Sequence, residues 1–395
     1  MRSTLRLVFA AGALAVLGAT SACGSTPPVQ TLSTDAAPSA TTTTDAAPVP
    51  TADDLGPVLE PLRAASGVPG LSAAVYRGGE AVARGAVGTR KQGDAIPITT
   101  TDVWHLGSDT KAMTATLAAI LVEEKKLDWK TPILELLPDL PMDPGFAKVT
   151  FEDLLFHRAG LPASLPTSWM QSARSSKDFV ASRKDLARVL LLAKPSQAPG
   201  TYVYSNAGYI VAGAILESVA KDSWENVLKA RLFDKLGMTT CGFGPPAAVG
   251  ETNQPWGHSG ATGAYKPVAP GPLADNPLPL GPAGTVHCSL DDWAKFAHTH
   301  ARGQKEGGLV SKETFTKLHT APAGGDYAMG WIVAPRSWSG GVALTHVGSN
   351  TTFMATAWVA PAKDLVFLVV TNAADEAAAR ASDDTIGALV KTYAK

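Results

Sequence analysis

The sequence predicts an α+β fold in which one antiparallel sheet is built from both ends of the chain. Two observations lead to this prediction. Strand-like segments lie near both ends of the globular region, and a long stretch of helical patterns separates them. We therefore expect the sheet to be flanked by the first and last helices, and the middle of the chain to form a largely helical subdomain. This arrangement indicates a single α+β unit rather than two independent domains.

The start of the chain predicts a lipoprotein-type signal peptide over residues 1–22. Two arginines supply a short positive region, and residues 7–18 are apolar but too few to span a bilayer of ~30 Å. Small residues then lead to Cys23, which such a signal would acylate. We expect export and a lipid anchor at Cys23 on the outer face of the cell membrane. Because Thr20 stands where an aliphatic residue is usual, an ordinary cleaved signal with an incidental Cys23 is the alternative.

Residues 23–51 are rich in Thr, Ala and Pro and have no aromatic side chain, so they are expected to form a disordered tether. The globular domain is expected to cover residues 52–395. The whole chain is 45% hydrophobic, with a net charge of −1 and no block of basic residues. The apolar fraction is sufficient for a large hydrophobic core. Without a basic block, we do not expect the protein to bind nucleic acid.

The first elements of the domain follow from spacing and from turn residues. Leucines 55, 59 and 62 have helical spacing, and Gly67 ends that helix. A hairpin follows over 71–76 and 80–86, with Gly78 and Gly79 at its turn. A strong helical pattern then covers residues 110–126.

The rest of the domain divides into four regions. Residues 131–236 are expected to be helical segments separated by Pro and Gly, and residues 242–284 to be long loops. Successive strands are expected at 330–333, 342–346, 352–359 and 365–371, before a final helix over 373–393.

The clearest chemical motif is Ser108-Asp109-Thr110-Lys111, at the start of the predicted helix 110–126. A serine there has its backbone N–H near the positive end of the helix, and a lysine three residues later lies on the same face. The lysine can reach the serine oxygen and can take its proton if burial lowers the lysine pKa. The other match, Ser218 to Lys221, lies late in a helix and is taken as a chance occurrence.

A second motif is Tyr204-Ser205-Asn206, which follows a Pro-Gly turn and precedes a helical run. A positive charge beside Tyr204 would favour its phenolate, which could then act as a general base. Asn206 offers an amide that donates to a substrate carbonyl and accepts from Lys111. A helix-capping loop with a packed tyrosine is the alternative interpretation.

The third motif is His346-Val347-Gly348-Ser349, at the end of the predicted strand 342–346. Glycine allows the backbone to approach a substrate closely. The backbone N–H of Ser349 could complete an oxyanion hole with that of Ser108. Another H-x-G, over residues 258–260, lies in the loop-rich region without a strand pattern and is rejected for that reason.

In this order, Ser108-x-x-Lys111, Tyr204-x-Asn206 and His346-x-Gly348 resemble the motifs of the serine β-lactamase and penicillin-binding-protein family. The closest branch is the class C-like one, which includes DD-peptidases and β-lactamase-fold esterases. The resemblance implies a β-lactamase/transpeptidase-like fold and an acyl-enzyme on Ser108 that water then releases as the acid. It implies neither a metal nor a cofactor.

The third motif departs from the family pattern, which has Lys-Thr-Gly or Lys-Ser-Gly where this chain has His346, Val347 and Gly348. A near-neutral histidine and an apolar valine hold a substrate carboxylate less well. The expected substrates are therefore esters or amides of small acyl groups. A D-alanyl-D-alanine carboxypeptidase or β-lactamase acting on cell-wall peptides or β-lactams is the alternative. A catalytically silent relative that binds cell-wall peptides is an alternative of a different class.

Other hydrolase chemistries are weakly supported. His298 and His300 are two residues apart and would not face one another on a helix, so they do not predict a zinc site with His287. No G-x-S-x-G motif indicates an α/β-hydrolase. Cys241 and Cys288 are either a disulfide or two buried thiols, and spacing alone leaves this open.

Overall fold

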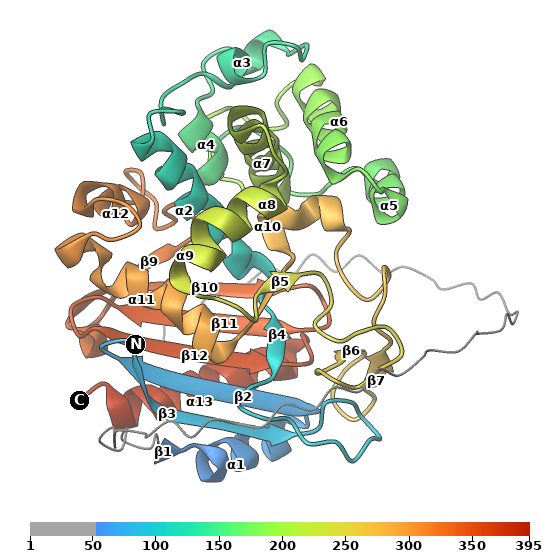
Figure 1. Cartoon of the computed structure of the whole chain (residues 1–395), viewed down its shortest axis with the longest axis vertical. Helices are drawn as coiled ribbons and strands as arrows, with labels where there is room; N and C mark the ends of the chain where they lie inside the picture. The colour runs from blue at the N-terminus through green and yellow to red at the C-terminus, as the bar shows by residue number, and fades with distance from the viewer. Residues whose placement is uncertain (1–52) are drawn as a thin grey trace, which may run out of the picture. The chain divides into compact units, whose positions relative to one another are not determined.

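A seven-stranded, largely antiparallel sheet forms the centre of the protein in the computed structural model, which describes residues 53–395 (Figure 1). Only the short first strand pairs in parallel with its neighbour. Across the sheet the order is β1 (Asp53–Asp54), β3 (Glu80–Gly88), β2 (Gly70–Arg77), β12 (Leu365–Thr371), β11 (Met354–Ala360), β10 (Gly341–Ser349) and β9 (Ile332–Arg336).

The sheet joins the two ends of the domain, as the sequence predicts. β2 from the N-terminal part pairs with the whole length of β12 from the C-terminal part. The pairing runs from Leu71 opposite Thr371 to Arg77 opposite Leu365. All seven residues of β12 are buried because helices cover both faces of the sheet. Its side chains divide between two hydrophobic clusters, with Phe367 on one face and Leu368 on the other.

Each face of the sheet is covered by different helices (Figure 1). The first and last helices, α1 (Gly56–Ser66) and α13 (Glu376–Tyr393), pack on one face and on each other. On the other face lie α11 (Leu290–Glu306) and α12 (Lys312–Leu318), together with α2 (Thr110–Glu123). The predicted helix after Ser108 is therefore present, and it ends three residues earlier than expected.

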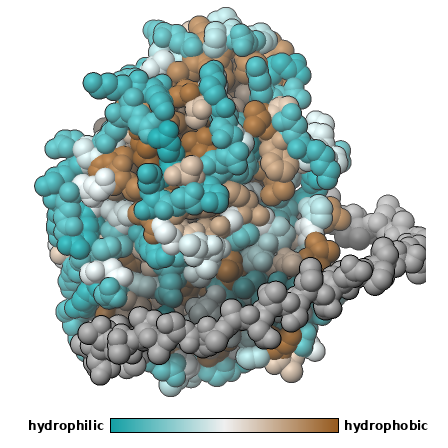
Figure 2. Space-filling view, in the orientation of Figure 1, coloured by the Kyte–Doolittle hydropathy of each residue, from teal (hydrophilic) through white to brown (hydrophobic). Residues whose placement is uncertain are grey.

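The middle of the chain forms the predicted helical subdomain. Its elements are α3 (Ile133–Leu136), η2 (Pro144–Phe146), α4 (Phe151–Leu155), α5 (Thr167–Ser175), α6 (Phe179–Leu192), α7 (Asn206–Ala220), α8 (Trp224–Leu228), the π-helical η3 (Lys229–Phe233) and α9 (Asp234–Leu236). The buried ion pairs of Arg183 with Glu217 and Glu225 join α6, α7 and α8. Hydrophilic side chains cover most of the face shown in Figure 2, and hydrophobic ones show mainly in the upper half of that view, where this subdomain lies.

The prediction of long loops over residues 242–284 is wrong in part. The region contains β5 (Gly242–Phe243), the hairpin of β6 (Gly257–Ser259) with β7 (Lys266–Val268), η4 (Leu278–Leu280) and α10 (Gly281–Gly284). A second sheet has the order β4 (Val103–His105), β8 (Val286–Ser289), β5. Strands of two to four residues show no period of their own, and it is long-range pairing that stabilises them.

Cys241 and Cys288 form a disulfide that ties the segment before β5 to β8. It closes a loop with a sequence separation of 47 residues, and such a loop contributes roughly 4 kcal/mol in the chain-entropy model. Within residues 53–395 no helix is both long and apolar enough to cross a bilayer. The predicted signal peptide, Cys23 and the tether lie outside the described residues.

Candidate active site

Ser108 lies on a tight turn between a short strand and a helix. β4 leads into the 3-10 turn η1 (Gly107–Asp109), and α2 begins directly after it. Gly107 has φ +52, and a Cβ atom there would come within 2.3 Å of the backbone nitrogen of Ser349. A glycine is therefore required before the serine, both for its conformation and for its close approach to β10. Ser108 itself is half-buried, so a substrate can reach it.

Lys111 lies in the first turn of α2, three residues after Ser108, and is completely buried. Its Nζ lies 3.0 Å from Ser108 Oγ and 2.8 Å from Asn206 Oδ1. The carbonyl oxygen of Ala283, in α10, is 2.6 Å away. The structure therefore brings the first and second motifs together around one amine, and it adds a backbone acceptor that sequence reasoning did not find.

Burial lowers the pKa of Lys111 from its ordinary 10.5 to about 7, and the neighbouring Asp109 opposes this by favouring the charged amine. Near neutral pH a large fraction of the amine is consequently uncharged. An uncharged Nζ at this distance can accept the proton of the Ser108 hydroxyl.

Tyr204 and Asn206 are positioned by the start of α7. Ser205 precedes this helix, and its backbone N–H donates to His157 Nδ1 at 3.1 Å. The His157 ring packs on the Tyr204 ring at 4.3 Å between centres. Lys111 Nζ lies 5.0 Å from the centre of the Tyr204 ring. Tyr204 is thus held between the His157 ring and the Lys111 amine.

The expectation that Lys111 favours a Tyr204 phenolate is wrong. Burial raises the pKa of Tyr204 well above its ordinary value, and the contact with the Ser108 hydroxyl counteracts only part of this effect. The phenol therefore stays protonated at neutral pH. It can pass a proton on, but it does not begin the reaction as a base.

The third motif closes the site from the sheet side. His346 is buried in the second half of β10, and burial followed by the charge of Lys111 lowers its pKa to about 3, so the ring is neutral at pH 7. Its Nε2 lies 3.3 Å from the hydroxyl of Tyr327. A Cβ on Gly348 would lie 2.0 Å from the carbonyl oxygen of Leu106. Only glycine lets β10 approach the Ser108 turn this closely.

Aromatic rings line the space beside these motifs. Tyr327 packs 4.7 Å from His157 and 6.1 Å from Tyr204, and Tyr202, which is 45% exposed, lies 5.9 Å from Tyr327. Sequence reasoning missed Tyr327 and Tyr202 because single aromatic residues in loops carry no motif. It also passed over Asp109, which lies inside the first motif and is 2% exposed.

The serine and histidines that the sequence analysis rejected as site residues lie away from Ser108. Ser218 is near the C-terminal end of α7 and lines a cavity of about 380 Å³ that no residue of the three motifs lines. His298 pairs with Asp364 at 3.1 Å, whereas His300 pairs with His319 at 2.8 Å. His258 does lie on a strand, contrary to expectation, and both its ring nitrogens contact backbone groups. In residues 53–395 no cluster of three His, Cys, Asp or Glu side chains is arranged to hold a metal ion.

The family assignment follows from comparison with known proteins. Residues 57–392, which include all three motifs, match the family model described as Beta-lactamase. The chain belongs to the Beta-lactamase family. The resemblance and the fold class predicted from the sequence are therefore confirmed.

This Beta-lactamase family member has curated relatives in fungi and bacteria. It is 32% identical to Unguisins hydrolase ungD of Aspergillus violaceofuscus over 50% of this chain and 36% of that protein. It is 29% identical to Penicillin-binding protein 4 of Amycolatopsis lactamdurans over 60% of this chain and 61% of that one. The matches thus span less than two thirds of either relative.

Among solved structures, the octameric penicillin-binding protein homologue from Pyrococcus abyssi superimposes with a TM-score of 0.67. The two sequences are 24% identical, and the match covers 84% of this chain and 77% of the other. This likeness shows a shared fold.

Proposed function

We propose that this Beta-lactamase family protein is a serine hydrolase that works through an acyl-enzyme on Ser108. The observation that supports this most strongly is the buried Lys111 amine, 3.0 Å from Ser108 Oγ and with a pKa of about 7. A serine hydroxyl beside a lysine that is partly uncharged at neutral pH is an activated nucleophile.

In the first half of the reaction, Ser108 Oγ gives its proton to uncharged Lys111 and bonds to the carbonyl carbon of the substrate. The carbonyl oxygen becomes an oxyanion that accepts hydrogen bonds from the backbone N–H groups of Ser108 and Ser349. The proton passes from Lys111 through the Tyr204 hydroxyl to the leaving alcohol or amine, and the C–O or C–N bond breaks. Water then attacks the acyl-Ser108 ester, releasing the acid and restoring the serine.

Testing the nucleophile requires only two variants. Ser108→Ala should abolish covalent labelling by a fluorophosphonate probe. Ser218→Ala is the matched control in the other S-x-x-K sequence and should label fully. Full labelling of the Ser108→Ala protein would overturn the assignment. A wild type that does not label at all would instead favour a catalytically silent peptide-binding relative.

The proposed substrates are small esters or amides without a carboxylate beside the scissile bond. His346 is neutral at pH 7, Val347 offers no hydrogen bond, and the Asn350 side-chain amide donates to Asp275 at 2.8 Å. A substrate carboxylate beside the third motif would therefore lie among side chains that stabilise it poorly, and leaving a buried charge without donors costs ~1–3 kcal/mol or more.

To test this preference, kcat/KM is measured for p-nitrophenyl butyrate, nitrocefin and a diacyl-Lys-D-Ala-D-Ala peptide. The wild type should prefer the butyrate ester. Val347→Thr should shift the ratio toward the two carboxylate-bearing substrates by up to ~10-fold, the effect of one modest hydrogen bond. A wild type that prefers the peptide or the cephalosporin would replace the esterase proposal with the carboxypeptidase or β-lactamase alternative.

We also propose that the protein is exported and anchored to the outer face of the cell membrane through a lipid on Cys23. The disulfide between Cys241 and Cys288 supports an oxidising compartment. Cys23→Ala should release the protein from the membrane fraction or stall its processing. Soluble wild type with no lipid mass on its N-terminal peptide would exclude the anchor.

A further inference from the structure

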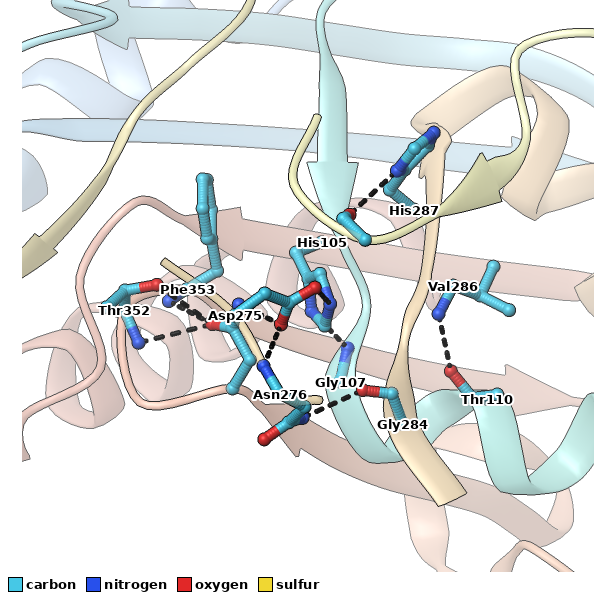
Figure 3. A network of polar contacts seen from close by, with 12 residues as sticks. His105, Gly107, Thr110, Asp275, Asn276, Gly284, Val286, His287, Thr352 and Phe353 are labelled. Atoms are coloured by element: carbon cyan, nitrogen blue, oxygen red, sulfur yellow. Dashed lines mark hydrogen bonds and ion pairs between the residues drawn. The ribbon is translucent and has the colours of Figure 1, made fainter. Parts of the chain in front are cut away.

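A buried carboxylate lies behind the Ser108 turn, on a part of the chain that carries none of the three motifs. Asp275 precedes η4 and is 5% exposed, and His105, at the end of β4, is 0% exposed. Asp275 Oδ2 lies 2.9 Å from His105 Nε2. Figure 3 shows this pair beside the segments that carry Gly107, Gly284 and Phe353.

The contacts of the two ring nitrogens of His105 identify its tautomer. The backbone N–H of Gly107 donates to His105 Nδ1 at 3.0 Å, so Nδ1 is an acceptor and carries no proton. The ring proton is therefore on Nε2, the atom that lies 2.9 Å from Asp275 Oδ2. Through this ring, the carboxylate holds the peptide directly before the nucleophile (Figure 3).

Asp275 also holds the segment that follows the third motif. Its Oδ1 accepts from Asn350 Nδ2 at 2.8 Å. The side-chain oxygen of Asn350 in turn accepts from the backbone N–H groups of Thr352 and Phe353 at 3.2 and 2.9 Å. Asn350 lies two residues after Gly348, so these hydrogen bonds fix the end of β10 against the Ser108 turn.

A third set of hydrogen bonds connects Asp275 to the segment beside Lys111. Asp275 Oδ1 accepts from the backbone N–H of Asn276 at 2.6 Å, and Asn276 Nδ2 donates to the carbonyl oxygen of Gly284 at 2.9 Å. Gly284 follows Ala283, whose carbonyl oxygen accepts from Lys111. One carboxylate therefore connects the segments that carry the nucleophile, the proposed oxyanion N–H of Ser349 and an acceptor for the catalytic amine.

We infer that Asp275 and His105 are positioning residues for the hydrolase reaction, an inference that rests on the proposed function. Neither acts on the substrate directly. Asp275 Oδ1 accepts from Asn350 and from the backbone of Asn276, while Oδ2 faces Nε2 of His105 at 2.9 Å. Only a carboxylate presents acceptor oxygens to all three groups at once. The carboxylate fixes the tautomer of His105, and the ring fixes the Gly107 peptide from which Ser108 projects.

Three variants test the two contacts of the pair separately. Asp275→Asn places an NH₂ group among donors, because an amide has only one acceptor atom. His105→Gln keeps a donor near the Nε2 position toward Asp275 and loses the acceptor for Gly107. His105→Asn keeps an acceptor near the Nδ1 position and loses the donor toward Asp275. The matched control is His287→Asn, since His287 lies opposite His105 in the β4–β8 pair and its Nδ1 contacts the Gly244 carbonyl instead.

The measurement is the rate of fluorophosphonate labelling of folded, disulfide-bonded protein, with kcat and KM for p-nitrophenyl butyrate. We expect Asp275→Asn and both His105 variants to label at the wild-type site about 10- to 100-fold more slowly, since small misplacement of a reacting group has effects of this size. The loss should fall on kcat rather than KM, and His287→Asn should keep the wild-type rate. Asp275→Glu, which keeps the charge, should recover part of the loss.

A lower thermal stability with unchanged labelling rates in the folded Asp275 and His105 variants would overturn the inference and leave a purely structural network. If Asp275→Asn does not fold, the His105 variants decide the question by the same criterion. Failure of the proposed function is distinguished by the wild type, which would then not label, or by a Ser108→Ala protein that does.

Discussion

Replacing Lys111 by methionine should change the pH dependence of stability in a way that follows from the burial of its amine. The pKa of Lys111 falls from 10.5 to about 7 in the folded protein, which corresponds to roughly 5 kcal/mol of unfavourable free energy for the charged form. Methionine is unbranched and of similar length, and it removes this term. It also leaves three acceptors without their donor, those of Ser108, Asn206 and Ala283, at ~1–3 kcal/mol for each buried group.

These opposing terms make the net effect at a single pH small, but the dependence on pH has a definite sign. The unfolded lysine keeps its proton up to about its ordinary pKa, whereas the folded one loses it above about 7. Between these values the unfolded lysine binds more protons than the folded one, so the contribution of Lys111 to stability rises with pH. From pH 6 to pH 9 the two pKa values give a rise of about 2.5 kcal/mol in the free energy of unfolding. The methionine variant lacks this rise.

The assay is urea unfolding of wild type and Lys111→Met at pH 6 and pH 9, followed by tryptophan fluorescence with the disulfide intact. The stability of the variant relative to wild type should fall by about 2.5 kcal/mol between the two pH values. Lys221→Met, at an exposed lysine of the other S-x-x-K sequence, is the control and should show no such change. A relative stability that is constant or that rises with pH would refute the burial argument for Lys111.

Three further outcomes are expected. In wild type the rate of fluorophosphonate labelling should rise with pH through about 7. Burial raises the pKa of Asp109, but its ionised form favours the charged amine, so Asp109→Asn should move this midpoint downward; an upward move would contradict the coupling. Gly348→Ala should reduce labelling at least ~100-fold because its Cβ would force β10 away from the Ser108 turn, and near-normal labelling would show that this approach is not needed. Replacing Cys241 and Cys288 by serine should lower the free energy of unfolding by roughly 4 kcal/mol, measured in urea; no change would contradict the chain-entropy argument.

Local patterns were sufficient to predict the longer elements in and around the central sheet. The hairpin of β2 and β3 was predicted from alternating strands around Gly78 and Gly79, and the structure has it over Gly70–Gly88. The final helix is also present, beginning three residues later than predicted. These elements are long enough to show their period, and turn residues mark their ends.

Contacts between distant segments could not be predicted in the same way. Asp275 lies in a region interpreted as loops, and nothing around it indicates that it approaches His105 and Asn350. The small sheet of β4, β8 and β5 was missed because its strands are too short to show a pattern. Burial is likewise a property of the folded chain, so the raised pKa of the Tyr204 phenol could not be predicted from the sequence.

In the proposed reaction, burial also links the activation of Ser108 to the choice of substrate. It opposes the charged forms of Lys111, Tyr204 and His346 alike, so near neutral pH the site consists largely of uncharged donors and acceptors. When Ser108 attacks, the proton that it loses forms an ammonium group beside the new oxyanion, and the two charges stabilise one another. A carboxylate on the substrate would add an anion without such a partner.

A lysine in place of His346 would supply that partner, but it would also place a second cation near Lys111. The charge of Lys111 already acts on His346, so the two positions are electrostatically coupled. A second positive charge would lower the pKa of Lys111 further and leave it a weaker base. His346→Lys should therefore improve binding of carboxylate-bearing substrates while slowing acylation per bound substrate, so that a lower KM is accompanied by a lower kcat. In this site, carboxylate recognition and basicity of the amine cannot be adjusted independently.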